Sequence, residues 1–366
     1  MSAIPPSATT LNVGALSAIF DKTTASYKLL FFIGLLQLIE NRLRRFDDDR
    51  TFALDEITSS LLSFGWYPHR FFKLSFGVQD QVGTVLDQLD FDLSERAVTS
   101  PEAHQALRHA LADQFDRIGA ATLQRYVPQR LLTPFFLDAL RGLPDQKKDR
   151  RIRELAESTF TSDHPPLYRF ANGGAHIEIH PRWMEYLKAN FLIVKGWALN
   201  HWAVYLQKNN PNSPAIIEKI APPSERASLA RQRKVWKQLL AELPMMCIYS
   251  NTPVKTDTFD LDHFLPWSFI CHDQYWNLLP VNSENNRSIG STLPTPEQVE
   301  VFINAQIQAL QVAQRLLPSK QWAAMAEDYS AGLGLSKAEL VYPERVTAAY
   351  TKTLHPMISL AQSLGY

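Results

Sequence analysis

The chain has little cysteine and no excess of either charge. Its 366 residues include two cysteines, and 37 Lys and Arg balance 37 Asp and Glu, so the formal net charge is zero. Two cysteines exclude a disulfide framework and are typical of a protein in a reducing cytosol. A strong autonomous DNA binder is normally basic overall or over one face, and this composition does not indicate one. We therefore expect a cytoplasmic protein that does not depend on bulk positive charge.

Long apolar runs and targeting signals are also missing. The first ten residues, MSAIPPSATT, contain neither the basic start nor the apolar stretch of an export signal. The most apolar run, residues 27–39, is too short to span a bilayer and contains Gln37. The sequence therefore predicts a buried helix there and no association with a membrane.

What the chain does have is enough apolar sequence for a substantial core. Apolar residues make up 45% and charged residues 20% of the composition, which argues against overall disorder. A chain of this length usually forms two or three domains. Apolar residues at three- and four-residue spacing predict a mainly helical protein. The expected helices span residues 23–46, 54–65, 82–88, 101–118, 120–141, 183–207, 296–317, 319–330, 336–352 and 354–364.

Two stretches interrupt the helical pattern. Residues 168–180 predict a β-hairpin around the turn Asn172-Gly173-Gly174. Residues 259–263 alternate apolar and polar side chains, as a short strand does, and residues 277–281 form a second β-like run. Asn282 or Ser283 can then cap a short helix over residues 284–287. Strand, loop, strand and helix follow one another within about thirty residues, which is a compact unit.

This unit would bring three chemically useful side chains together. Asp262 offers a charged oxygen and Asn286 a neutral amide oxygen, and a hard divalent cation such as Mg²⁺ prefers oxygen ligands. His263 has the side chain whose ordinary pKa lies nearest neutrality, so it can take a proton from an attacking water. Together these residues favour metal-assisted hydrolysis of a phosphodiester.

The same stretch resembles the HNH (ββα-metal) endonuclease family. The family pattern runs DH-x-x-P, then N-L, then N-x-x-K near the start of the helix. Asp262-His263 with Pro266 matches the first element, Asn277 begins the second, and Asn286 falls on the third. The resemblance covers residues 244–296 and is specific, because several elements recur in order at the right spacing.

The resemblance implies a role for each matched residue. Asp262 and Asn286 would hold Mg²⁺ or Mn²⁺, and His263 would be the general base. Asn277 would brace the loop through backbone hydrogen bonds and so orient the histidine.

The sequence departs from the family pattern at two places. Many members bind a structural zinc through two C-x-x-C pairs, and one thiolate with three neutral oxygen groups makes a poor zinc site. The corresponding positions here are Cys247, Ser250, Asn282 and Asn285. We therefore expect no structural zinc; the HNH domain of the RNA-guided CRISPR effector nuclease likewise lacks it. The usual lysine three residues after Asn286 is Ile289.

Basic residues near the motif are candidates for contacts with substrate phosphates. Arg233 and Lys234 lie in a basic stretch ahead of the motif, and Arg287 follows Asn286. The alternative is that the residues of the basic stretch form a solvated helix face.

We expect a mainly α-helical protein with a small embedded ββα-metal unit, α+β overall. A unit of about fifty residues without zinc has little core of its own, so flanking helices should support it. The expected parts are an N-terminal helical domain (1–160), a hairpin with a helical linker (161–243), the nuclease domain (244–296) and a C-terminal helical region packing on it (297–366).

These residues predict an endonuclease that cuts DNA, controlled by a protein partner or an oligomer. A role in bacterial anti-phage defence follows by analogy alone. Two alternatives stay open. One is a non-catalytic interaction protein with a degenerate HNH unit, which Ile289 favours, and the other is a nuclease that cleaves RNA.

Overall fold

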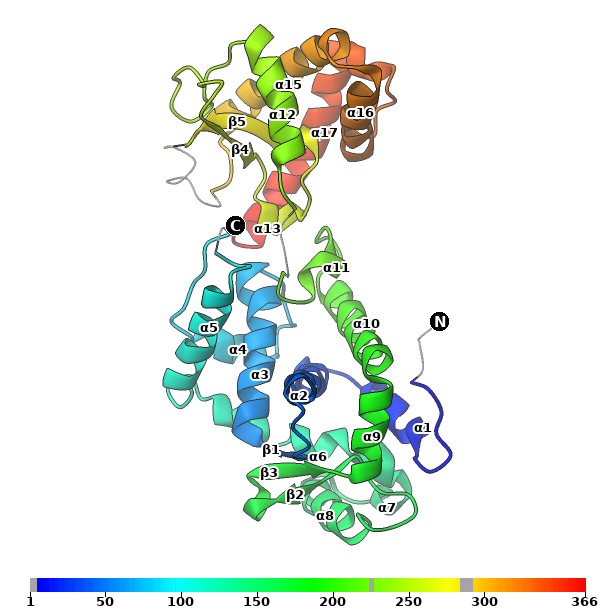
Figure 1. Ribbon diagram of the computed structural model, residues 1–366. Helices are drawn as coiled ribbons and strands as arrows, with labels where there is room; N and C mark the ends of the chain where they lie inside the picture. The colour runs from blue at the N-terminus through cyan, green and yellow to red at the C-terminus, as the bar shows by residue number, and fades with distance from the viewer. Residues whose placement is uncertain (1–4, 96, 224–226, 284–291) are drawn as a thin grey trace. The chain divides into compact units, whose positions relative to one another are not determined.

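The computed structural model describes residues 5–95, 97–223, 227–283 and 292–366, and the chain forms two compact units. Both are built mainly from helices, with short strands in two small sheets, so the predicted fold class is confirmed (Figure 1). Among the described residues, no helix combines the length and the apolarity needed to cross a membrane. The first unit comprises Met1–Leu93, Ser100–Pro211 and Ile216–Pro222, and the second Ser94–Thr99, Asn212–Ala215 and Pro223–Tyr366.

Helix α2 (Tyr27–Arg44) lies at the centre of the first unit. Its residues from Leu29 to Leu36 are all buried, because α3 (Leu54–Trp66) and α10 (Phe191–Asn209) pack against it. Gly34 permits the close approach of α3, since a Cβ there would lie 2.9 Å from the Leu61 backbone nitrogen. The remaining helices of this unit are α1 (Val13–Ser17), α4 (Gln81–Asp87), α5 (Pro101–Asp113), α6 (Val127–Leu131), α7 (Leu137–Leu140), α8 (Asp145–Ser158), α9 (Pro181–Ala189) and α11 (Ile216–Lys219).

A three-stranded antiparallel sheet completes this unit. Strand β3 (His176–Ile179) lies between β1 (Thr51–Ala53) and β2 (Tyr168–Ala171). The predicted hairpin is thus present, and β1 is a third strand that the sequence did not reveal. Because β1 and β3 pair, this sheet joins residues on both sides of the boundary expected at residue 160.

Four helix predictions were wrong in their extent. The expected helix 120–141 is a series of short α- and 3₁₀-helices, and Pro128 and Pro134 stand at the starts of two of them, where a missing N–H is tolerated. The helix expected over 183–207 is two helices, α9 and α10, that meet at the non-helical residue Asn190. Conversely, the helices expected over 336–352 and 354–364 are one, α17 (Pro343–Ser363), which continues through Pro356.

The second unit surrounds a hairpin of β4 (Phe259–His263) and β5 (Leu278–Asn282). One hydrophobic core joins residues of this hairpin to the helices before and after it. Phe264 stacks on Phe302 with ring centroids 3.8 Å apart, so α15 (Pro296–Leu316) lies directly against the loop after β4. The helices are α12 (Ala230–Glu242), α13 (Trp267–Ile270), α15 (Pro296–Leu316), α16 (Ser319–Leu333) and α17, and Thr295 and Gln298 form the predicted capping box of α15.

Candidate active site

The candidate site is built on the end of strand β4. Strands β4 and β5 pair antiparallel, with Asp262 opposite Leu279 and His263 opposite Leu278. Both strands therefore occur where the sequence predicted them. Successive side chains of a strand point to opposite faces, so Asp262 and His263 leave the strand in different directions.

Asn277 closes the loop between the two strands. Its side chain is fully buried, and its Oδ1 accepts a hydrogen bond from the Leu265 backbone N–H (2.9 Å). Its Nδ2 donates to the Leu265 carbonyl oxygen (3.0 Å), and its own carbonyl accepts from the Phe264 N–H (2.9 Å). These three bonds fix the backbone of the two residues that follow His263.

The imidazole of His263 is bonded to a carboxylate that the sequence analysis did not single out. Nε2 of His263 lies 2.8 Å from Oδ1 of Asp273, and the two side chains are 9% and 16% exposed. An ionised carboxylate only accepts hydrogen bonds, so Nε2 carries the proton of this pair. In neutral His263 the other ring nitrogen, Nδ1, is then the acceptor.

The carboxylate of Asp262 also has a partner that the sequence did not indicate. The hydroxyl of Tyr249 donates to Oδ2 of Asp262 at 2.6 Å. Burial raises the pKa of the Asp262 carboxyl, and the bond from Tyr249 opposes this rise. A cation beside Asp262 would offset the cost of burying its negative charge.

A divalent ion fits the donor chemistry that the described residues offer. Within those residues, no three His, Cys, Asp or Glu side chains form a group that could hold a metal. Mg²⁺ does not need such a group, because it keeps several waters and is usually held by one or two carboxylates. Asp262 supplies one hard oxygen donor. Asn286 and Arg287, the other predicted ligand and a candidate phosphate contact, lie outside the described residues.

Hydrogen bonds through Thr252 connect two of the positions where many family members carry zinc ligands, Ser250 and Asn282. The Ser250 and Thr252 hydroxyl oxygens lie 2.7 Å apart. Nδ2 of Asn282 donates to the Thr252 hydroxyl (2.9 Å) and to the Pro253 carbonyl (3.2 Å). These bonds tie the turn after Cys247 to the end of β5 with neutral groups. Asn285, the fourth position, lies outside the described residues.

Side chains from the last three helices hold β5 and the residues before it. Gln306 of α15 donates to the Leu278 carbonyl (2.8 Å) and is itself bonded by the Tyr329 hydroxyl of α16. Tyr350 of α17 donates to the Trp276 carbonyl (2.8 Å). The backbone on either side of Asn277 is therefore fixed from three helices.

Trp276 also packs directly on the backbone of α16. A Cβ built on Gly332 would lie 2.1 Å from Nε1 of Trp276, a separation that no side chain tolerates. Glycine at position 332 is thus required for the Trp276 indole to pack against α16.

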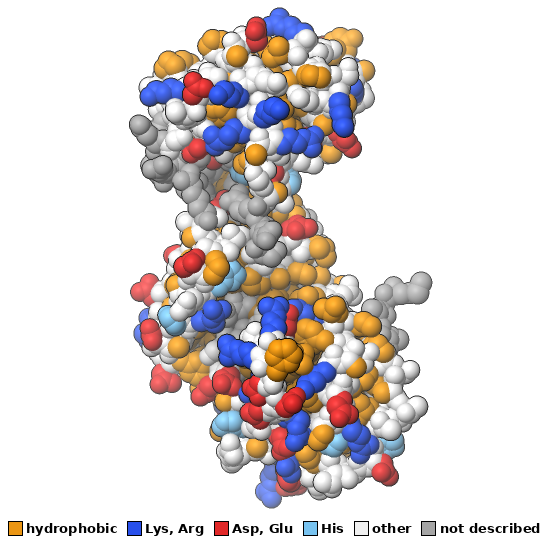
Figure 2. All heavy atoms as spheres, viewed as in Figure 1, with side chains coloured by type: hydrophobic (Ala, Val, Ile, Leu, Met, Phe, Trp, Pro, Cys, Tyr) orange, Lys and Arg blue, Asp and Glu red, His pale blue; other side chains and the backbone are white. Residues whose placement is uncertain are grey.

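The two described candidates for phosphate contact differ in their surroundings. The Arg233 guanidinium donates to the Phe259 carbonyl and to Asp260, so it links α12 to the start of β4. Lys234 is exposed on the same helix. Lys and Arg side chains are visible over α12 (Figure 2).

An antiparallel hairpin that ends in an Asp-His pair, with a buried Asn bracing the loop, has the site architecture of a ββα-metal nuclease. A family model described as HNH endonuclease matches residues 247–295. The chain therefore carries an HNH-family domain within a larger protein. No curated protein and no solved structure matched the chain. An HNH domain indicates nuclease activity in general and, with it, nucleic-acid binding, and such nucleases generally use a divalent metal.

Proposed function

We propose that the protein is a divalent-metal-dependent endonuclease that hydrolyses DNA phosphodiester bonds. The observation that carries this proposal is the arrangement at the end of β4. There a buried carboxylate, Asp262, directly precedes a histidine whose Nε2 is bonded to Asp273. The bond leaves Nδ1 of His263 as the basic nitrogen, and the bonds of Asn277 keep the backbone beside it in place.

Mg²⁺ or Mn²⁺, held by Asp262 and Asn286, would supply a Lewis acid that offsets the charge developing on the phosphate and the leaving oxygen. Nδ1 of His263 takes a proton from a water as that water attacks phosphorus in line. The P–O bond to the 3′ oxygen of the preceding nucleotide breaks and that oxygen takes a proton from solvent, which leaves a 5′-phosphate and a 3′-hydroxyl. Asp273 is a positioning residue, because it holds the imidazole without touching the reacting atoms.

The zero net charge of the chain bears on how it would bind DNA and how its activity would be controlled. The formal net charge of the chain is zero, and affinity for duplex DNA comes largely from positive charges that contact phosphates. Lys234, Arg233 and Arg287 would contribute local phosphate contacts. A protein partner or a second copy of the chain would then supply much of the affinity and the control. Restriction of foreign DNA in a bacterial anti-phage system is a setting that suits such control.

A plasmid-nicking assay with Mg²⁺ or Mn²⁺ tests the proposal. We expect His263→Ala to abolish nicking. His355→Ala is the control, because His355 is exposed on α17, far along the chain from the motif. Nicking by His263→Ala at the rate of the unaltered protein would remove His263 from the role of general base.

Ile289, at the position of the usual lysine, favours a second candidate function, that of a non-catalytic interaction protein. Calorimetry with Mn²⁺ on the unaltered chain and on Asp262→Ala shows whether the metal site is intact. Digests of duplex DNA, single-stranded DNA and RNA then distinguish the candidates. The DNA endonuclease is supported if the unaltered chain binds Mn²⁺ and cuts DNA and Asp262→Ala does neither. The RNA nuclease is supported if the unaltered chain cuts RNA alone. An absence of both cutting and metal binding supports the interaction protein.

A further inference from the structure

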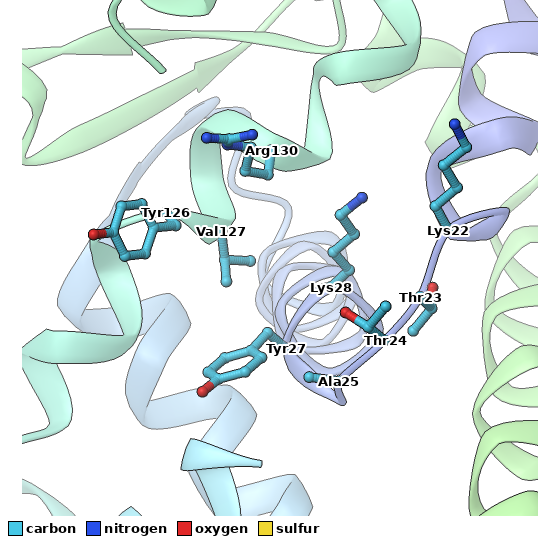
Figure 3. A pocket seen from close by; sticks show the side chains of 9 residues that line it. All are labelled: Lys22, Thr23, Thr24, Ala25, Tyr27, Lys28, Tyr126, Val127 and Arg130. Carbon is cyan, nitrogen blue, oxygen red and sulfur yellow. The ribbon is translucent and has the colours of Figure 1, made fainter. Parts of the chain in front are cut away.

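A cavity of about 240 Å³ lies in the first unit, where the chain enters helix α2 (Figure 3). Lys22, Tyr27 and Lys28 line it from the start of α2 and the turn before it. Arg130 lines it from helix α6, and Tyr126 from the N-cap of that helix. No residue of the HNH-family domain takes part, so this cavity is separate from the candidate active site.

Three cationic side chains share this cavity. In Figure 3 the side chains of Lys22, Lys28 and Arg130 extend to the same side of α2. Arg130 is bonded to Asp145 and Asp149. By contrast, in the described part of the chain no carboxylate forms an ion pair with Lys22 or Lys28. Two amines in this cavity are thus left without a neutralising partner.

The electrostatics of Lys28 agree with this reading. Burial lowers the pKa of its amine, and the positive charges of Arg130 and Lys22 lower it further. No acidic group is among the causes of the shift. The surroundings of Lys28 therefore disfavour its charge, and an anion bound in the cavity would favour it.

The start of α2 adds hydrogen-bond donors to these charges. The first N–H groups of a helix have no partner within the helix, and no described side chain caps α2. The hydroxyl of Ser26, the cap residue, donates to Asp80 instead (3.0 Å), and the Ser26 N–H does the same (2.7 Å). Asp80 also accepts from the first N–H groups of α4, so it serves both helix starts. The N–H groups of the first turn of α2 lie at the residues that line the cavity.

We propose that this cavity binds the phosphate group of a small phosphate monoester, such as a mononucleotide. The amines of Lys22 and Lys28 would pair with the phosphate oxygens, and the start of α2 would donate to them. Pockets that enclose a drug-sized ligand measure roughly 300–1,000 Å³, so this smaller cavity holds the phosphate end. The rings of Tyr27 and Tyr126 offer apolar faces to the rest of the ligand.

A discrete phosphate fits this unit better than the backbone of a duplex. An extended polyanion needs a continuous track of unpaired positive charge. On the nearby helix α8, Lys148 is paired with Asp145, and Arg150 and Arg151 with Glu154. Acidic and basic side chains are intermixed on the visible face of this unit (Figure 2). The cavity thus brings together two amines without a carboxylate partner among the described residues, whereas Lys148, Arg150 and Arg151 of α8 are paired.

Calorimetry on the full chain without divalent metal tests the proposal, with inorganic phosphate, AMP and a short DNA duplex as separate titrants. We expect phosphate and AMP to bind, and Lys28→Met to weaken their binding about tenfold or more, because a charge-assisted bond is lost. Lys208→Met is the matched control, since Lys208 is exposed on α10 and does not line the cavity. Asp262→Ala should bind AMP as the unaltered chain does.

Thermal melting gives a second readout. Without ligand, Lys28→Met should melt at the same or a higher temperature, because it removes a half-buried charge that has no carboxylate partner in the described part of the chain. AMP should raise the melting temperature of the unaltered chain and not that of the variant. Lys22→Met, at an exposed position, repeats the binding test should Lys28→Met fail to fold.

Three results would overturn the proposal. In the first, the unaltered chain binds neither phosphate nor AMP. In the second, Lys28→Met and the control Lys208→Met bind AMP with equal affinity. In the third, the duplex is the one titrant that binds, and its binding depends on Lys28. The last result would make the cavity a contact for nucleic-acid backbone rather than for a small ester.

Discussion

At the scale of single residues, the arrangement of His263 depends on a carboxylate ten positions further along the chain. Asp273 fixes which ring nitrogen carries the proton, through the bond to Nε2 (2.8 Å). Partners of this kind orient a reactive side chain without contacting substrate, and removing them typically costs about 10–100-fold in affinity or activity. The role of Asp273 is therefore testable apart from that of His263.

We predict that Asp273→Ala lowers kcat for DNA nicking about 10–100-fold and leaves KM nearly unchanged, since the residue does not touch substrate. Asp273→Asn should lose less, because its amide oxygen still accepts from Nε2. Asp257→Asn is the control, an exposed acid paired with Lys237. If Asp273→Ala and Asp273→Asn lost activity to the same extent, and both also unfolded less cooperatively, Asp273 would instead have a structural role.

His272, the neighbour of Asp273, provides a prediction about pH and stability. Burial lowers the pKa of His272 to about 4, and the nearby His263 contributes to this shift. Between pH 6.5 and 4 the unfolded chain therefore binds a proton at this position that the folded chain does not. The free energy of unfolding should fall by roughly 1–3 kcal/mol from this group as the pH is lowered through that window.

The unfolded His272→Gln chain cannot take up a proton at this position. Its free energy of unfolding should therefore fall less between pH 7 and pH 4.5. Urea titrations of both proteins at the two pH values measure the difference. The quantity to compare is the change with pH in each protein, because the substitution also alters packing against Trp276. Parallel pH profiles would contradict the prediction.

The sequence revealed the site residues that belong to one short motif. It did not reveal the residues that contact this motif only in the folded chain. Asp262, His263 and Asn277 belong to one short pattern with strands on either side. Asp273 and Tyr249 reach the site through the shapes of loops, and loop conformation is not encoded by apolar periodicity. One signal existed: Asp273 is the single acidic residue in residues 264–276.

At the scale of elements, some periodic segments were predicted closely, whereas the long helices expected over 120–141 and 183–207 are divided and a short strand was missed. Helix α3 and the start of α15 follow the sequence closely, since repeated apolar spacing and a capping box define them. Strand β1 has three residues, too few for alternation to be recognised. Helix α17 continues through Pro356, because its tertiary packing outweighs the hydrogen bond that the proline removes.

The contact between Gly332 and Trp276 predicts a costly substitution. Gly332→Ala should lower the free energy of unfolding by about 1–3 kcal/mol, because the new methyl group would overlap the indole. It should also reduce nicking, since Trp276 precedes the brace residue Asn277. Gly196→Ala is the matched control, a helical glycine with open space around it, and it should be neutral or stabilising by up to about 1 kcal/mol.

Urea unfolding of the two variants measures this difference. Equal stability of Gly332→Ala and Gly196→Ala would mean that Trp276 is not held in the described position.

At the scale of the whole molecule, each unit has its own close helix contact, which predicts separate unfolding. Gly34 lies against the backbone of Leu61 in the first unit, and Gly332 lies against Trp276 in the second. We expect differential scanning calorimetry to resolve two transitions, because chains of this kind need not unfold in one step. Gly34→Ala should lower the temperature of one transition and Gly332→Ala that of the other. A single transition that both variants shift equally would show that the units unfold together.

Chain length predicted more than one domain, but not how the chain is divided between them. A sequence analysis assigns contiguous stretches, whereas the second unit here takes residues from three separate stretches. The finer four-part division remains a prediction about which parts fold independently.

The first of those stretches, Ser94–Thr99, has a consequence for synthesis. Glu95 accepts a hydrogen bond from the Ser268 N–H, 173 positions later in the chain. A ribosome that adds about 5–20 residues per second needs roughly 10–35 seconds to make that partner. The first unit can thus fold during translation before residues 94–99 can contact their partner in the second unit. A clone beginning at residue 223 would omit it, and supplying residues 94–99 as a separate peptide should restore the missing contact.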